Sequence, residues 1–220
     1  MNMLYIFKYY NLIYYMENLL NNLELKYGGL VQNVSRTCIS KYENNYYNKH
    51  QGGDRMNSIY HQYSKYYSKY LEHYIHKDNI ILAEVGILTG IGLAIWCDIF
   101  PKANIYGFDI DINNFNNNFK NLIDKGAFIQ NKPNINIFDQ YLNNSKYILD
   151  TCKDKISIVI DDGCHLDKAI INTFESFLPH LSNNFVYFIE DNINVHRYLK
   201  IHFPQYNIFY ENEMTIITNK

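Results

Sequence analysis

The sequence is poor in the residues that mark several large classes of protein. Its 220 residues contain only 4 cysteines and 4 prolines, and no two cysteines form a C-x-x-C pair. This excludes a zinc finger of the usual spacing and a disulfide-rich scaffold, so we expect reduced thiols and a cytoplasmic location. Charged residues make up 19% of the chain and the formal net charge is −2, so nothing favours a nucleic-acid partner.

Uninterrupted hydrophobic runs of membrane-spanning length are also missing. The apolar N-terminal stretch over residues 1–27 is broken by Lys8, Asn11 and Glu17, and no small-residue cleavage site follows it. This excludes a membrane span and a secretory signal, and we expect no membrane partner. The stretch instead predicts a helix that ends at Gly28-Gly29 and packs on the domain or on a partner, which leaves room for a homo-oligomer.

What the chain has in quantity is tyrosine, 22 residues, together with asparagine, isoleucine and lysine. This composition is typical of AT-rich coding and suggests a viral or protist source. A hydrophobic content of 47% suits one compact domain, which we place at residues 54–220 behind an N-terminal helical and irregular extension at 1–53. Residues 30–53 are polar and predict irregular structure. Tyrosines at helical spacing predict an amphipathic helix over 57–75, whose stripe is more typical of core than of ligand contact.

From residue 80 onward strands and helices alternate. The predicted strands are 80–85, 104–108, 135–138, 155–160 and 185–189. Helices are predicted from the glycine-rich turn to Ile99, at 113–125 and at 167–178, and residues 206–210 and 214–218 predict a closing hairpin. This order predicts an α/β fold with a mostly parallel sheet, a C-terminal antiparallel hairpin and helices on both faces.

Each of the five predicted strands delivers glycine or carboxylate at its C-terminal end. The residues concerned are Gly86, Asp109, Asp139, the pair Asp161-Asp162 and the pair Glu190-Asp191. In open parallel sheets that edge is where ligands bind, so we expect one site there.

The first of these strand ends carries a glycine-rich turn, Glu84 to Gly92. Gly86 and Gly90 allow the backbone to approach a ligand closely, and Asp109, at the end of the next strand, is placed to bind ribose hydroxyls. Leu88 occupies the place of the middle glycine of G-x-G-x-x-G, which favours a nucleoside without phosphates over a dinucleotide. Alternatively, the glycine-rich turn only reverses the chain and binds no ligand.

The fourth and fifth strand ends gather the chemistry of a metal site. Asp161-Asp162-Gly163-Cys164-His165 follows one strand and Glu190-Asp191 follows the next. Clustered carboxylates suit Mg²⁺, which relieves their repulsion, and His165 is placed to act as a base near neutral pH.

The turn and strand ends resemble the class I methyltransferases, which use S-adenosyl-L-methionine. Residues 84–92 are similar to their first motif and 106–109 to their second. The resemblance implies a Rossmann-like sheet, and a cofactor site to which we assign Tyr63, Glu84, Gly86, Gly90, Asp109, Asp139 and Gln140. In that assignment the two glycines line the methionine part, Asp109 holds the ribose, Asp139 and more weakly Gln140 reach the adenine, and Tyr63 stacks nearby.

The pattern D-D-G-x-H followed by E-D resembles, more narrowly, the metal-dependent sugar O-methyltransferases of macrolide biosynthesis, of the mycinamicin type. The similarity runs over about residues 50–195 and includes 53–56 and 61–70. It implies Mg²⁺ held by Asp162, Glu190 and Asp191, His165 as general base, and a hydroxyl of a sugar or glycan as acceptor. Cys164 departs from a usual serine, and Arg55-Met56 from a lysine-glycine step.

Other functions and roles stay open at this stage. The acceptor is alternatively a catechol-like small diol, and the chain is alternatively a non-catalytic module that only binds S-adenosyl-L-methionine. A nicotinamide dehydrogenase is a third candidate. Asp161 is expected to be structural, and Glu190-Asp191 has the alternative role of capping the next helix.

Overall fold

The computed structural model describes residues 3–38, 43–56, 59 and 61–220. The helices are α1 Met3–Tyr27, α2 Ser64–Leu71, α3 Ile91–Ile99, α4 Asn113–Asp124, α5 Ser145–Cys152, α6 Asp167–Phe177 and α7 Val195–His202, with short 3-10 turns at Glu72–Tyr74 and Leu178–His180. The strands are β1 Gly29–Cys38, β2 Glu43–Gly52, β3 Ile81–Val85, β4 Asn104–Asp109, β5 Asn134–Ile137, β6 Ile156–Asp161, β7 Leu181–Ile189, β8 Tyr206–Glu211 and β9 Met214–Asn219.

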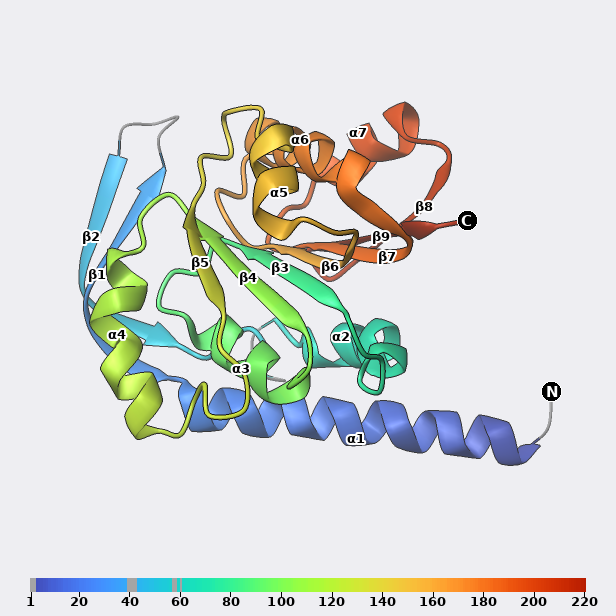
Figure 1. The fold of residues 1–220 in the computed structure, drawn as a ribbon, viewed down its shortest axis with the longest axis horizontal. Helices are drawn as coiled ribbons and strands as arrows, with labels where there is room; N and C mark the ends of the chain where they lie inside the picture. The colour runs from blue at the N-terminus through green and yellow to red at the C-terminus, as the bar shows by residue number, and fades with distance from the viewer. Residues whose placement is uncertain (1–2, 39–42, 57–58, 60) are drawn as a thin grey trace.

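Seven strands form the central sheet in the order β5-β4-β3-β6-β7-β9-β8 (Figure 1). β3 to β7 pair in parallel, whereas β9 runs antiparallel to both β7 and β8. The mostly parallel sheet with a C-terminal antiparallel hairpin is therefore confirmed. The strand order reverses between β3 and β6, and the crevice outside their carboxyl ends is the expected place for a ligand.

Helices cover both faces of the sheet, which explains why β3 is apolar at every position except Glu84. Leu82 packs into a cluster with side chains of α1, α2 and α3, while Ile81, Ala83 and Val85 face a second cluster with side chains of α5, α6 and α7. Figure 1 shows α1, α2 and α3 on one side of the sheet and α5, α6 and α7 on the other. All five residues of β3 are buried. Successive side chains on a strand point to opposite faces, so a strand covered on both sides carries no polar alternation.

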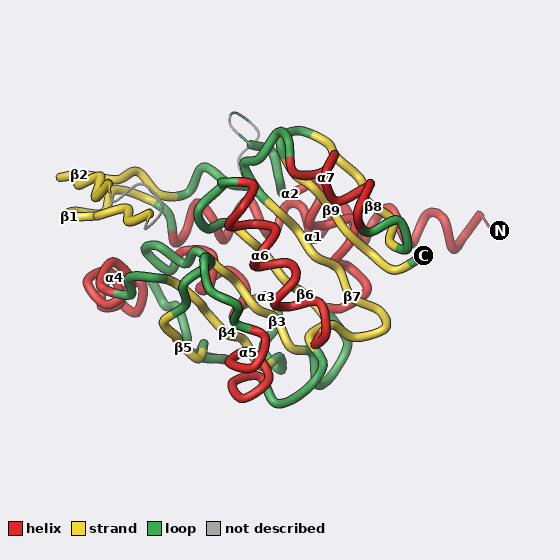
Figure 2. Tube along the Cα trace, turned by 90° about the horizontal axis from the view of Figure 1, so that it is seen from above, coloured by secondary structure: helices red, strands yellow, loops and turns green. Residues whose placement is uncertain are grey.

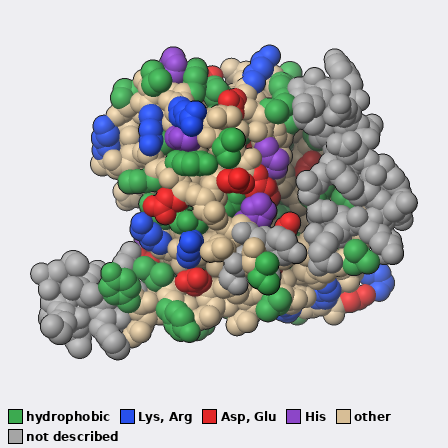
Figure 3. All heavy atoms as spheres, turned by 180° about the vertical axis from the view of Figure 1, so that it is seen from behind, with side chains coloured by type: hydrophobic (Ala, Val, Ile, Leu, Met, Phe, Trp, Pro, Cys, Tyr) green, Lys and Arg blue, Asp and Glu red, His purple; other side chains and the backbone are tan. Residues whose placement is uncertain are grey.

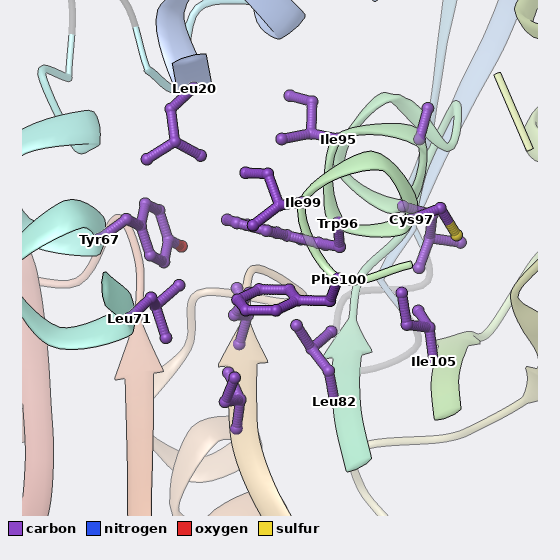
Figure 4. Close-up of a cluster of buried hydrophobic side chains, with 14 of the residues drawn as sticks. Leu20, Tyr67, Leu71, Leu82, Ile95, Trp96, Cys97, Ile99, Phe100 and Ile105 are labelled. Atoms are coloured by element: carbon purple, nitrogen blue, oxygen red, sulfur yellow. The ribbon is translucent and has the colours of Figure 1, made fainter. Parts of the chain in front are cut away.

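The first cluster joins three helices that are far apart in the sequence. Trp96 of α3 and Phe100, the residue after that helix, lie between Tyr67 of α2, Leu20 of α1 and Leu82 of β3, and all five side chains are buried (Figure 4). The predicted N-terminal helix thus belongs to the core of the domain. The division between an extension at 1–53 and a domain at 54–220 stays a prediction.

The prediction of irregular structure over 30–53 is wrong for 30–38 and 43–52, and residues 39–42 lie outside the described part. β1 and β2 form a two-stranded antiparallel hairpin, which pairs with no other strand of the described residues and extends to one side of the domain (Figures 1 and 2). Val31 and Val34 are buried, while Leu30 is exposed. A hairpin with no partner sheet needs few apolar positions, so no clear alternation of apolar and polar residues marked its strands in the sequence.

The helix predicted over 57–75 is shorter than expected. Residues 57, 58 and 60 lie outside the described part, and α2 begins only at Ser64, after Gln62 with φ of 58°. Its tyrosine stripe is core as expected, since Tyr63, Tyr67 and Tyr74 are buried. Helices α5 and α7 were not predicted, because they span only eight residues each and carry few buried side chains.

The described cysteines are in two chemical states. Cys97 and Cys152 are free and buried, as expected for reduced thiols. Cys164 is disulfide-bonded, which corrects that expectation at this position. Within the described residues, no helix combines the length and hydrophobicity that a membrane crossing requires.

Candidate functional site

A cavity of about 430 Å³ opens at the carboxyl ends of β3, β4, β6 and β7. Its wall includes the glycine-rich turn, Asp109, Asp139, Asp162, His165 and Asp191. Figure 3 shows acidic and histidine side chains gathered on one face of the molecule. The five predicted strand ends therefore meet at one cavity, whose size lies in the range of small-molecule sites, roughly 300–1,000 Å³.

The glycine-rich turn has a backbone that glycine favours at three positions. Gly86, Leu88 and Gly90 have φ of 84°, 42° and 80°. A Cβ on Gly86 would lie 2.1 Å from the carbonyl oxygen of Asp162, and one on Gly90 would lie 2.4 Å from the ring of Phe115. Both glycines are thus required by close packing. Leu88 is in the left-handed region, which glycine adopts without the steric cost that a side chain brings.

This conformation leads to a prediction for position 88. Leu88→Gly and Leu88→Ala both remove the half-buried side chain, and only alanine keeps the Cβ that the left-handed region disfavours. We expect Leu88→Gly to exceed Leu88→Ala in free energy of unfolding by about 1 kcal/mol. Urea denaturation of both variants measures this difference. A more stable alanine variant, the usual order at unstrained positions, would contradict it.

Asp109 ties the turn to the second strand. Its carboxylate accepts hydrogen bonds from the backbone amides of Leu88 and Asp111, each at 3.0 Å. Burial raises the pKa of this carboxyl, while the amide donors oppose the shift. The side chain thus positions the turn and lines the cavity at the same time.

Asp139 and Gln140 differ in what they leave available. Asp139 is half-buried on the cavity wall and accepts the backbone amide of Tyr141 at 2.8 Å. The amide group of Gln140 is engaged at both ends: Nε2 donates to Asp161 and Thr173, and Oε1 accepts the backbone amide of Cys164 at 2.7 Å. Gln140 therefore braces the loop after β6, and Asp139 is the better placed of the two to contact a ligand.

Asp161 has the structural role expected of it. It is 1% exposed and accepts hydrogen bonds from Gln140 Nε2 at 2.8 Å and from the Tyr187 hydroxyl at 3.4 Å. Burial raises the pKa of Asp161 to about 7. Its side chain lies on the face of the sheet away from Glu84, because Asp161 pairs with Ile189 whereas Glu84 pairs with Ile160.

The same alternation places three other carboxylates on one face. Glu84 pairs with Ile160, and Asp162 follows Ile160 by two residues. Glu190 follows Ile189, the partner of Asp161, and so shares the face of Asp162. Glu84, Asp162 and Glu190 thus end three adjacent strands on the side of α1, α2 and α3.

Two of the three predicted metal ligands meet the predicted base. Oxygen and nitrogen atoms of Asp162, His165 and Asp191 lie within 4.8 Å of one another, and all three side chains are partly exposed to the cavity. His165 Nε2 lies 3.8 Å from Asp162 Oδ1. His165 and Asp191 have φ of 23° and 54°, in the left-handed region where strain is found at functional sites.

Glu190 does not belong to that group. It is 2% exposed, and its oxygens bind Arg55 Nε at 3.0 Å and the hydroxyl of Tyr67. Burial raises the pKa of the Glu190 carboxyl, and the attraction of Arg55 opposes the shift. Ligation of magnesium by Glu190 therefore stays a prediction, and in this structure Arg55 is the cation that contacts its carboxylate.

Arg55 contacts the acidic residues of the site, although the sequence did not predict it as a site residue. Its guanidinium also binds Glu84 Oε1 at 2.7 Å and Asp162 Oδ2, so one cation contacts three carboxylates. Glu84, assigned to the cofactor, is 1% exposed and directs one oxygen to this arginine. One signal was present: lysine supplies most of the positive charge of this chain, so an arginine beside an acidic site indicates a need for its planar donors.

Tyr63 lies on the metal side of the cavity. Its buried hydroxyl donates to Asp191 Oδ1 at 2.6 Å, and His61 Nδ1 lies 3.4 Å from the same oxygen. His61 lines the cavity, and with Asp191 and Glu213 it forms a second group that can hold a metal among the described residues. Tyr63 thus orients a predicted metal ligand, and its assignment to the cofactor stays a prediction.

The alternative helix-capping role of Glu190-Asp191 belongs to the next residue. Asn192 Oδ1 accepts the backbone amides of Asn194 at 2.8 Å and Val195 at 2.7 Å at the start of α7. Its Nδ2 donates to the carbonyl oxygen of His165 at 2.9 Å. Asn192 therefore caps the helix and fixes the backbone of the predicted base. The side chains of Glu190 and Asp191 are not used for capping.

Comparisons with known proteins give structural matches alone. No protein-family model and no curated protein sequence matches the chain. MycE methyltransferase from the mycinamycin biosynthetic pathway, in complex with Mg, SAH and mycinamycin VI, matches with a TM-score of 0.58 and 15% identity over 75% of this chain and 50% of that one. A second MycE structure, with Mg and SAH, gives a TM-score of 0.59 with the same identity and coverage. The chain thus spans about half the length of the MycE chains.

A smaller enzyme of the same kind also matches. A putative caffeoyl-CoA O-methyltransferase from Staphylococcus aureus gives a TM-score of 0.50 at 12% identity, over 64% of this chain and 76% of that one. The chain has the class I methyltransferase fold. The resemblance that the sequence motifs indicated is confirmed at the level of the fold, and in the class I fold the glycine-rich turn and the acidic strand ends take the edge where ligands bind.

Proposed function

We propose that this chain is a methyltransferase that uses S-adenosyl-L-methionine and Mg²⁺ to methylate a hydroxyl of a sugar or glycan. The observation that carries the proposal is the single cavity that joins the glycine-rich turn, Asp109 and Asp139 to the group of Asp162, His165 and Asp191. The fold supports it, and so does the presence of Mg and SAH in the MycE structures named above.

The residues present fit the methyl donor. The turn at Gly86 and Gly90 keeps side chains away from one wall of the cavity, and Asp109 and Asp139 provide carboxylates on the wall beside it. We assign the methionine part of the donor to the turn, the ribose hydroxyls to Asp109 and the adenine to Asp139. The cavity volume of about 430 Å³ suits a ligand of this size.

The residues present also fit a hard divalent cation. Asp162 and Asp191 offer carboxylate oxygens to the cavity, and Mg²⁺ in proteins is commonly held by one or two carboxylates with water in the remaining positions. Each carboxylate has a second contact that fixes its orientation, Asp162 with Arg55 and Asp191 with Tyr63.

In the mechanism, Asp162 and Asp191 would hold a Mg²⁺ that would lower the pKa of the acceptor hydroxyl, and the glycine-rich turn with Asp109 and Asp139 would hold the donor that would supply the methyl group. The chain's own part is to bind both reactants in one cavity and to take up the proton. His165 lines the cavity and its side chain is partly exposed, which suits a proton acceptor. The backbone of His165 is held by Asn192, so its imidazole is fixed beside Asp162. Much of the acceleration comes from this alignment of two bound reactants.

The acceptor class is tested by methyl transfer from labelled S-adenosyl-L-methionine to a panel of glycosides and catechols. We expect transfer to a glycoside in the presence of Mg²⁺ and a loss of about 100-fold or more in a chelator, restored when Mg²⁺ is added back. Transfer to catechols instead would assign the alternative acceptor.

Equal rates with and without chelator would contradict the metal's role. Binding of SAH without transfer to any acceptor would favour a non-catalytic module. Self-association and the lack of a nucleic-acid partner stay predictions.

A further inference from the structure

Arg55 is held in place before its side chain reaches the site. Its carbonyl oxygen accepts the backbone amide of Tyr63 at 3.1 Å. The next amide, of Met56, donates to Glu24 Oε1 of α1 at 2.7 Å, and the Met56 side chain is fully buried. The arginine thus comes from a backbone segment fixed to α1 and to the start of α2, and its side chain is only 13% exposed.

The guanidinium uses three nitrogens on three carboxylates from three strands. Nη1 contacts Glu84 of β3, Nη2 contacts Asp162 after β6, and Nε contacts Glu190 after β7. Burial by itself would lower the pKa of Arg55, but the charges of Glu190, Asp162 and Glu84 raise it well above its ordinary value. Arg55 therefore stays charged as the counter-ion of this face of the sheet.

Both oxygens of Glu190 already have protein partners, and the side chain is only 2% exposed while Arg55 is in place. One oxygen binds Arg55 and the other accepts the hydroxyl of Tyr67, which is itself buried against Trp96 and Phe188. Asp162 is different, because Oδ2 binds Arg55 while Oδ1 lies on the side of His165. The acidic residues thus divide into a buried part neutralised by Arg55 and a part open to the cavity.

We propose that Arg55 is a positioning residue that takes the place of the metal as the counter-ion of Glu190, so that the cation is held by Asp162 and Asp191 without Glu190. This inference rests on the proposed function for the presence of a metal. It differs from the ligand set that the sequence resemblance implies, in which Glu190 is a direct ligand. Arg55 in this view limits the affinity of the site, because it withholds one carboxylate from the cation.

Metal affinity is the direct test, and it needs no turnover. Mn²⁺ serves as a paramagnetic substitute for Mg²⁺, and its binding is followed by electron paramagnetic resonance. We expect Glu190→Gln to change the Mn²⁺ dissociation constant less than about threefold, and Asp191→Asn to weaken binding by about 30-fold or more. Both variants keep Arg55 and remove one charge each, so they are matched.

Removal of the arginine is expected to strengthen Mn²⁺ binding, whereas removal of a ligand weakens it. In Arg55→Met, Glu190 becomes available, and we expect Mn²⁺ to bind about tenfold more tightly. Adding Glu190→Gln to that variant returns the affinity to near the wild-type value. Arg55→Lys keeps the charge but not the three fixed donors, and we expect it to fall between wild type and Arg55→Met.

Two results would overturn the proposal. One is a loss of Mn²⁺ binding in Glu190→Gln as large as that in Asp191→Asn. The other is an Arg55→Met variant with wild-type affinity that does not depend on Glu190. If Arg55→Met does not fold, the comparison of Glu190→Gln with Asp191→Asn decides alone.

Failure of the proposed function is seen separately. If the wild-type chain binds SAH by calorimetry but binds no Mn²⁺, the metal-assisted reaction is wrong, and the counter-ion role is then judged by melting temperature. We expect Arg55→Met to melt about 5 °C or more below wild type, because a buried carboxylate loses its partner. We expect Glu190→Gln in the same chain to restore part of that loss, and no restoration would contradict the counter-ion role.

Discussion

His165→Ala is expected to lower the rate of methyl transfer by about 10²- to 10⁴-fold, the usual contribution of a positioned general base. The affinity for SAH should change less than about twofold, since the donor is assigned to the glycine-rich turn, Asp109 and Asp139. Single-turnover transfer from labelled donor and calorimetry with SAH measure the two quantities. His202→Ala is the matched control, because His202 lies on the surface of α7, stacked on Tyr198, outside the residues that line the cavity.

The expected effect follows from how the imidazole is held. Nε2 lies 3.8 Å from Asp162 Oδ1, Nδ1 is buried without a partner in the described part of the chain, and the carbonyl oxygen accepts Asn192. A histidine with a merely structural role would be expected to use its ring nitrogens in hydrogen bonds to the protein. Turnover within twofold of wild type in His165→Ala would defeat the assignment of this residue as the base.

The architecture could be predicted because it depends on patterns that are local in the sequence. β3 is a short strand that is apolar apart from Glu84, and the glycine-rich turn and an apolar helix follow it at once. A strand that is buried on both faces has a nearly continuous hydrophobic sequence, which can be recognised without the structure. Glycine at two positions of positive φ marks the turn. Repetition of this unit fixes the parallel sheet, and with it the edge where Asp109, Asp139 and Asp162 come together.

The role of Glu190 could not be predicted from the fact that it precedes Asp191. Successive residues on a strand point to opposite faces, so neighbouring acids at a strand end need not share a ligand. Asp161 and Asp162 separate in this way, and the sequence did indicate that Asp161 is structural. For Glu190 and Asp191 the outcome also depends on a φ of 54° at Asp191 and on Arg55, 135 residues earlier in the numbering than Glu190. Such a contact has no local signal.

The β1–β2 hairpin was missed for a related reason. Among the described residues its strands pair only with each other, so no clear alternation of apolar and polar residues marked them in the sequence. The C-terminal end of β2 nevertheless packs against the domain, since a Cβ on Gly52 would lie 2.3 Å from Ile91 Cδ1 of α3. The hairpin therefore leads directly to Arg55. The segment whose structure the sequence did not predict is thus followed by the arginine that neutralises Glu84, Asp162 and Glu190.

Gly86→Ala is expected to have the largest effect on stability of any single methyl group added at the site. The new Cβ would lie 2.1 Å from the carbonyl oxygen of Asp162 and 2.5 Å from Cα of Gly163, and backbone atoms cannot rotate away as a side chain does. The left-handed φ of 84° adds a further cost for alanine. Together these predict a loss of about 3 kcal/mol in the free energy of unfolding, measured by urea denaturation.

The matched control is Gly126→Ala, which separates the steric effect from the backbone conformation. Gly126 has φ of 82°, close to that of Gly86, but a Cβ there would meet no atom nearer than 3.9 Å. We expect it to lose only about 1 kcal/mol and to keep its affinity for SAH and for Mn²⁺. Gly86→Ala should lose both, because the segment it displaces carries Asp162 between the donor wall and the cation group. Equal stability losses in the two variants would mean that the contact between the turn and the strand end after β6 does not hold the cavity together.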